Sequence, residues 1–212
     1  MLIYMIHELD RPLVLVGPQG SGKTTIGGLL ARRLELELVD TDEIFEKIYQ
    51  EKIKDSLEKD PNFTRRLESL ILENRVKYKP DRNEYVISTG GGIVRPTGAG
   101  ISPNVLEELT QKCRELLQPA HVVYLQSHED LEQMAQINFE RINQDSVGSL
   151  QRISFGDGNN RCRGFEDMIK QRHPYYEAVA NYVALGQRKR DEVSLTPQEI
   201  TSNILEYLRK SN

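Results

Sequence analysis

The sequence has little cysteine, no excess of positive charge and no long apolar run, and each shortage excludes a class of protein. Its 212 residues include two cysteines, Cys113 and Cys162, which form no CxxC pair and show no metal-ligand spacing. Isolated thiols of this kind are typical of a reducing compartment. The formal net charge is −4, so no overall positive field attracts nucleic acid. We therefore expect no nucleic-acid partner.

Signals for secretion and for membrane insertion are also missing. The amino-terminal segment has no positively charged n-region, and Glu8 and Asp10 interrupt its apolar run. No later apolar stretch approaches the ~20 residues that a membrane-spanning helix needs. The sequence thus predicts a cytoplasmic protein with no membrane partner.

Short apolar runs alternate with amphipathic segments, which is typical of an α/β fold whose parallel sheet is covered by helices on both faces. The length favours one domain over residues 1–212. Strands are predicted at Leu13–Val16, Leu36–Val39, Tyr85–Ser88, His121–Leu125 and Tyr182–Leu185. Helices are predicted at Thr24–Leu34, at about 43–76 with a break at Lys59–Asn62, at Pro103–Leu117 with Ser102 as N-cap, at about 127–142, at Gly164–Ala180 and at Thr196–Lys210.

The most specific motif is the segment GPQGSGKT at residues 17–24, which matches G-x-x-x-x-G-K-[ST] between a predicted strand and a predicted helix. Its glycines let backbone N–H groups approach a β-phosphate, and the helix N-terminus adds a partial positive charge. We expect Lys23 to reach the β- and γ-phosphates and Thr24 to place its hydroxyl on Mg²⁺. By itself the motif indicates nucleotide binding, not a particular reaction. The predicted nucleotide-binding residues are Gly17, Gly20, Ser21, Gly22, Lys23, Thr24 and Thr25.

Two further polar segments follow predicted strands, at the sheet edge where α/β proteins bind ligands. In the segment DTD at residues 40–42, Asp40 is expected to serve hydrated Mg²⁺ and Asp42 to orient or deprotonate an acceptor hydroxyl. The alternative is a helix N-cap formed by Asp42 or Thr41. In the segment STGGG at residues 88–92, consecutive glycines favour close approach of bare backbone to a ligand, and the alternative is a flexible turn.

These motifs, with the helical R-x-x-E at residues 65–68 and QRHPYYE at residues 171–177, resemble the shikimate kinase family in order over about residues 12–182. The resemblance implies a P-loop kinase fold of the nucleoside-monophosphate-kinase type, with three layers and a five-stranded parallel sheet. It also implies an acceptor-binding helical region at about 43–80, a mobile lid at about 143–164, and a monomer. The implied reaction transfers the γ-phosphate of ATP to the 3-hydroxyl of shikimate.

The resemblance assigns roles to particular residues. Asp42 is expected to bind the acceptor hydroxyls and to act as the base, while Arg65 and Arg172 grip the acceptor carboxylate. A planar arginine fork fits a carboxylate with two hydrogen bonds, although either arginine taken alone is equally well explained as a solvated helix charge. The other expected ligands are Gly90, Gly91 and Gly92 for the acceptor, Thr24, Asp40 and Ser88 for the Mg²⁺ shell, and Pro197 on the adenine side.

The chain departs from the family pattern in two places. The lid arginine is normally followed by proline and an aliphatic pair, and no such segment occurs here. Arg152 is our candidate for this catalytic arginine, with Arg161 and Arg163 as rivals. Where the family has an arginine against adenine, this chain has Met134-Ala135-Gln136. Two alternatives therefore stay open: a kinase for another small anionic acceptor, such as a sugar acid or nucleoside monophosphate, and a nucleotide-binding regulatory protein without catalysis.

Overall fold

A computed structural model describes residues 9–78, 84–97, 100–144, 158–187 and 194–211. Its sheet has five parallel strands in the order β2-β3-β1-β4-β5. The prediction of a five-stranded parallel sheet is confirmed, and each strand lies within one residue of the expected bounds. The strands are β1 (Leu13–Val16), β2 (Glu37–Asp40), β3 (Tyr85–Ser88), β4 (His121–Gln126) and β5 (Tyr182–Leu185).

The helices follow the predicted order with finer breaks. Asp60 accepts a hydrogen bond from the Phe63 N–H (2.9 Å) and Pro61 opens the next helix, which confirms the predicted break. Ser102 caps the helix that follows it. The helix expected from residue 127 begins later, because Asp130 accepts from the first backbone N–H groups. The helices are α1 (Lys23–Leu34), α2 (Thr41–Tyr49), α3 (Ile53–Lys59), α4 (Pro61–Glu73), the π-helical turn η1 (Asn74–Tyr78), α5 (Pro103–Leu117), α6 (Leu131–Gln144), α7 (Gly158–Val179) and α8 (Pro197–Ser211).

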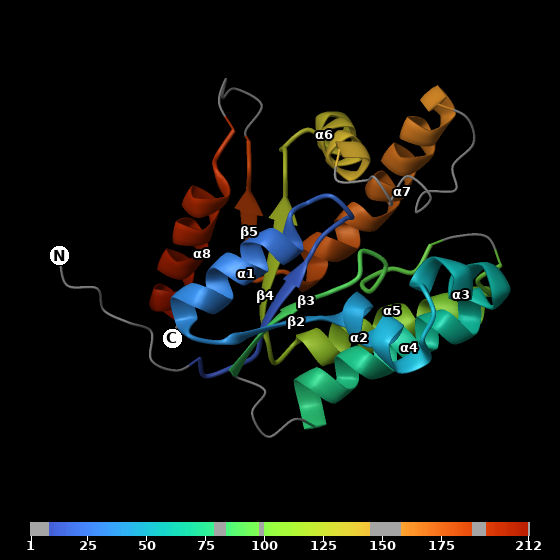
Figure 1. The fold of residues 1–212 in the computed structure, drawn as a ribbon, viewed down its shortest axis with the longest axis horizontal. Coiled ribbons are helices and arrows are strands. Elements are labelled where there is room, and N and C mark those ends of the chain that lie inside the picture. Colours follow the sequence, from blue (N-terminus) through green and yellow to red (C-terminus); the bar gives the residue numbers. More distant parts are fainter. Residues whose placement is uncertain (1–8, 79–83, 98–99, 145–157, 188–193, 212) are drawn as a thin grey trace.

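The side chains of β1 alternate between the two faces of the sheet, which is the middle layer of a three-layer fold. Leu13 and Leu15 pack with α1 and α8 on one face of the sheet. Val14 and Val16 point the other way and pack with α4, α5 and α7. Figure 1 shows α1 and α8 together on their side of the sheet, with α2 to α5 gathered away from them. None of the described helices is long and apolar enough to cross a membrane.

The sheet brings the ends of β1, β2 and β3 together, since these strands are neighbours and parallel. The carbonyl of Leu15 accepts hydrogen bonds from the Thr89 N–H (3.2 Å) and hydroxyl (2.9 Å). The hydroxyl of Thr41 accepts from the Gly90 N–H (3.0 Å). These bonds join the three polar segments singled out in the sequence into one site.

Candidate active site

The phosphate-binding segment forms a tight loop between β1 and α1. Gly20 and Gly22 have φ values of 77° and 90°, a region that favours glycine. A Cβ on Gly20 would also lie 2.5 Å from the carbonyl oxygen of Asn138 in α6. The α6 helix therefore packs directly on this loop, and the side chain of Arg141 donates to the Gly20 carbonyl (3.4 Å).

Lys23 is the first residue of α1 and is buried. Its ammonium donates to the carbonyl oxygens of Gly17 and Pro18, both at 2.8 Å. Burial lowers the pKa of Lys23 to about 8, and the carboxylates of Asp42 and Asp40 act in the opposite direction. The amine thus lies in the mouth of the loop, where the motif places it for a phosphate.

The three residues expected around Mg²⁺ lie together. One carboxylate oxygen of Asp40 accepts from the hydroxyls of Thr24 and Ser88, each at 3.1 Å. Among the described residues no group of three or more His, Cys, Asp or Glu could hold a metal. One carboxylate with hydroxyls nevertheless fits Mg²⁺, which is commonly bound by one or two carboxylates together with substrate phosphates and water.

The second oxygen of Asp40 has a structural role. It accepts from the Asp42 N–H (3.0 Å) and so caps α2. The alternative that Asp42 or Thr41 caps this helix is wrong, because β2 runs through Asp40 and α2 starts at once with Thr41. The carboxylate of Asp42 is thereby left available for other contacts.

The glycine triplet packs closely against charged side chains and the phosphate loop. A Cβ on Gly90 would lie 2.5 Å from a carboxylate oxygen of Asp42, and a Cβ on Gly92 would lie 2.5 Å from the guanidinium of Arg65. Gly91 faces the phosphate loop, 3.2 Å from its Cβ position to the Gln19 nitrogen. Larger residues would push these groups away, so the triplet serves close packing and is more than a flexible turn.

Asp42 carries the most perturbed carboxyl of the site. Burial, with help from the nearby charges of Glu68 and Asp40, raises its pKa to about 7, while Lys23 and Arg65 oppose that rise. One of its oxygens is buried and accepts no hydrogen bond from the described residues. A carboxyl that titrates near neutrality suits proton transfer from a hydroxyl.

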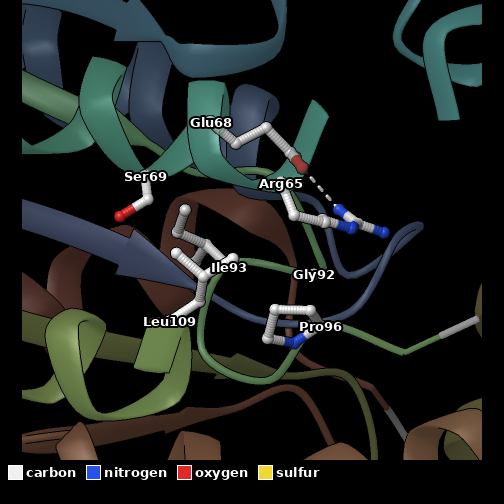
Figure 2. A pocket seen from close by; sticks show the side chains of 7 residues that line it. All are labelled: Arg65, Glu68, Ser69, Gly92, Ile93, Pro96 and Leu109. Atoms are coloured by element: carbon white, nitrogen blue, oxygen red, sulfur yellow. Dashed lines mark hydrogen bonds and ion pairs between the residues drawn. The ribbon is translucent and has the colours of Figure 1, made fainter. Parts of the chain in front are cut away.

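Arg65 forms a buried ion pair with Glu68, one helical turn along α4 (2.7 Å). Their side chains are 10% and 5% exposed, so Arg65 is not a solvated helix charge. Its Nε is buried and has no hydrogen-bond partner among the described residues. Figure 2 shows this pair at a small pocket that Gly92 also lines. The remaining lining residues are Ser69, Ile93, Pro96 and Leu109.

Arg172 approaches the glycine triplet from α7 and is 5% exposed. It donates to the carbonyl oxygens of Gly91 (3.1 Å) and Arg95 (3.2 Å). Burial lowers its pKa to about 10, and the positive charge of Arg65 contributes to that shift. Two cationic side chains from different helices therefore converge beside the triplet.

Two buried partners of this site were not among the predicted site residues. Glu68 and Tyr176 follow Arg65 and Arg172 by three and four positions, which places each pair on one helix face. The hydroxyl of Tyr176 donates to the Gly91 carbonyl. That helical spacing was the available sequence signal.

Other predicted residues are not gathered here. Arg152, with most of the expected lid, lies outside the described residues, and so does the side chain of Arg161. The segment's ends belong to α6 and α7, where Arg163 is exposed. Thr25 and Pro197 are exposed near the starts of α1 and α8.

The strand order and the phosphate loop ahead of α1 define a P-loop kinase of the nucleoside-monophosphate-kinase type. Comparisons with known proteins narrow this class. The family model described as shikimate kinase matches residues 19–209. The chain therefore belongs to the shikimate kinase family, whose members are ATP-dependent phosphotransferases acting on a hydroxyl group.

Individual relatives agree with that family. A shikimate kinase of Legionella pneumophila is 30% identical over 200 residues, covering 93% of this chain and 94% of the relative. One from Thermodesulfovibrio yellowstonii is 27% identical over 203 residues, covering 95% and 98%. The solved shikimate kinase from Acinetobacter baumannii, in complex with shikimate, is 25% identical, covers 96% of both chains and superposes with a TM-score of 0.69.

Proposed function

We propose that this protein transfers the γ-phosphate of ATP to the 3-hydroxyl of shikimate. The observation that carries the proposal is the convergence of the buried guanidinium groups of Arg65 and Arg172 beside the glycine triplet, close to Asp42. Two cations suit an acceptor with a carboxylate, and a carboxyl with a pKa near 7 suits its hydroxyl.

In this proposal each side of the site performs a separate task. The phosphate loop and Lys23 hold the β- and γ-phosphates, with backbone contacts from Gly17, Gly20 and Gly22. Asp42 orients the acceptor hydroxyl and takes up its proton as the oxygen attacks the γ-phosphorus, while the bond from that phosphorus to the bridging oxygen breaks and ADP leaves. Catalysis depends mainly on positioning and charge, because phosphoryl transfer needs little covalent help from the protein. Ser21, Thr25 and Pro197 complete the proposed nucleotide contacts.

The proposed metal site consists of Asp40, Thr24 and Ser88, the oxygen donors that lie together at the ends of β2, β3 and the start of α1. Mg²⁺ bound there would neutralise phosphate charge. The proposed lid spans about residues 143–164, with Arg152 supplying a further positive charge to the transferred group. We also propose that the enzyme acts as a monomer.

The direct test follows ADP release from ATP and Mg²⁺ with and without shikimate, with the product identified by mass. We expect release that depends on shikimate and a product heavier by one phosphoryl group. The Lys23→Ala protein is the blank. Shikimate-independent release, or none, in a protein that still binds ATP would overturn the proposal, and a panel of sugar acids and nucleoside monophosphates would then be assayed.

A further inference from the structure

The carbonyl oxygen of Gly91 receives two side-chain hydrogen bonds, both from α7. One donor is the guanidinium of Arg172 at 3.1 Å, and the other is the hydroxyl of Tyr176. Arg172 is held a second time, through the Arg95 carbonyl at 3.2 Å. A backbone carbonyl in a loop is ordinarily satisfied by one partner or by water, so this double engagement fixes the orientation of one peptide group.

Tyr176 itself is held rigidly. It is fully buried, and its ring stacks on Tyr124 of β4 with centroids 5.0 Å apart and planes 19° from parallel. The hydroxyl of Tyr124 bonds elsewhere, with His173 Nδ1 at 3.1 Å. Burial raises the pKa of Tyr176 to about 12, so the phenol keeps its proton at neutral pH and can donate it. The central sheet thus sets the position of the Tyr176 hydroxyl.

The peptide bond between Gly91 and Gly92 extends the fixed orientation of the Gly91 carbonyl to the part of the site that is proposed to bind the acceptor. No cis peptide bond occurs in the described residues, so the Gly92 N–H points opposite to the Gly91 carbonyl. Gly92 lies against the guanidinium of Arg65, and Gly91 lies against the phosphate loop at Gln19. Rotation of the peptide group between Gly91 and Gly92 would change both the backbone surface offered to the acceptor and the position of Arg172.

We propose that Tyr176 is a positioning residue for the acceptor: its hydroxyl, shared with Arg172 on the Gly91 carbonyl, holds the glycine triplet and the arginine in the geometry that binds shikimate. This inference rests on the proposed function. It assigns Tyr176 no contact with the substrate and no part in proton transfer.

The test is Tyr176→Phe, which removes the hydroxyl and keeps the ring that stacks on Tyr124. The matched control is Tyr124→Phe, which removes a buried hydroxyl from the same stacked pair without touching Gly91. We expect Tyr176→Phe to raise the KM for shikimate about tenfold, the size of one lost buried hydrogen bond, with kcat and the KM for ATP changed less than about twofold. Tyr124→Phe should leave all three constants near those of the wild type.

The outcomes separate the two proposals. Shikimate turnover by the wild type with an unchanged KM in Tyr176→Phe overturns the role of Tyr176 alone. Equal effects of the two substitutions, or loss of ATP binding or folding in Tyr176→Phe, also overturn it, because the hydroxyl would then serve general stability. Absence of shikimate turnover in the wild type overturns the proposed function and this inference with it.

Discussion

The two halves of the site are built in different ways. The phosphate side is one continuous segment, in which backbone groups, glycine conformations and the first residue of a helix provide the binding surface. The acceptor side is assembled from α4, the glycine triplet after β3, and α7, and depends on buried charged side chains. A local segment can specify the first, whereas only tertiary packing can create the second.

Burial disfavours the charged form of ionisable groups in both halves of the site, so it shifts the pKa values of a base and of an acid in opposite directions. It lowers the pKa of Lys23 to about 8 on the phosphate side and raises that of Asp42 to about 7 on the acceptor side. Each shift brings the pKa of a group with a proposed catalytic role close to neutral pH, where small changes in environment alter its charge. From this comparison we predict that activity is lost on the phosphate side when a chemical group is removed. On the acceptor side, activity should fall even when the charge is kept and only the geometry changes.

The largest effect is expected for Lys23→Ala. Removing the ammonium group that lies in the mouth of the phosphate loop should lower kcat by about 10³-fold, since a single preorganised donor is worth about that much in transition-state stabilisation. A coupled-enzyme assay of ADP release measures kcat. The control is Lys47→Ala, an exposed lysine of α2, which should keep wild-type turnover. A Lys23→Ala protein with more than a tenth of wild-type kcat would contradict the assignment.

Replacing Arg65 or Arg172 by lysine should lower kcat/KM for shikimate by about 10²-fold while the KM for ATP stays within about twofold. Lysine keeps the charge but lacks the fork that binds a carboxylate and, at Arg172, also two loop carbonyls. Steady-state kinetics with each substrate varied in turn measures both constants. If the lysine variants kept full affinity for shikimate at both positions, charge alone would matter, and the proposed difference between the two halves would disappear.

The two halves of the site also differ in how much of their structure the sequence could predict. The strand pattern, the phosphate loop and the cap at Ser102 follow from apolar spacing and local turn chemistry, and all lie where expected. The double use of Asp40 could not be predicted, because it requires knowing that β2 extends one residue and lies beside Ser88. Local rules describe one segment at a time, and that contact joins two.

The same limit applies on α7. Arg172 and Tyr176 share a helix face by their spacing, but their common target, the Gly91 carbonyl, is about eighty positions away in the chain. Likewise, the lysine and carboxylate pKa values depend on burial, which no motif states. The departure in the expected lid, at about residues 143–164, falls where local patterns are weakest, and Arg152 stays a prediction.

Activity should fall about tenfold for each pH unit below the pKa of Asp42, near 7, because the protonated acid cannot accept the hydroxyl proton. Stability should change in the opposite direction. The native state binds this proton more tightly than the unfolded chain between pH 3.8 and about 7, so raising the pH through that range destabilises the fold.

The substitution Asp42→Asn tests both signs. The variant should lose most of the activity, and the activity that remains should no longer fall at low pH, so the acidic limb of the pH profile disappears. It should also melt at a higher temperature than the wild type at pH 8 but not at pH 4. Charged groups also face Asp42 and influence its pKa, namely Glu68, Asp40, Lys23 and Arg65. Glu68→Gln is therefore the companion variant: it should shift the limb to lower pH without removing it. Equal melting temperatures of wild type and Asp42→Asn at pH 8 would contradict the cost assigned to this buried charge.

A smaller effect is expected for Asp40→Asn, which separates the two roles of this side chain. Asparagine caps a helix about as well as aspartate, so α2 should remain stable. The lost charge should raise the Mg²⁺ concentration for half-maximal activity about fivefold. Titration of activity with Mg²⁺ at fixed ATP, together with the melting temperature, measures both roles. A lower melting temperature with unchanged Mg²⁺ dependence would assign Asp40 to the cap alone.

The smallest effect is expected one residue beyond Arg65. Arg66 lies on the exposed side of α4 and pairs with Glu108 of α5, with Nη2 2.7 Å from Oε2. Exposed ion pairs contribute little because water already solvates both partners. Arg66→Ala should therefore change activity less than about twofold and the melting temperature by about 2 °C or less. Arg65→Ala, at the adjacent position, should lose most acceptor affinity. Equal losses at both positions would show that total positive charge near α4, rather than the buried placement of one guanidinium, governs acceptor binding.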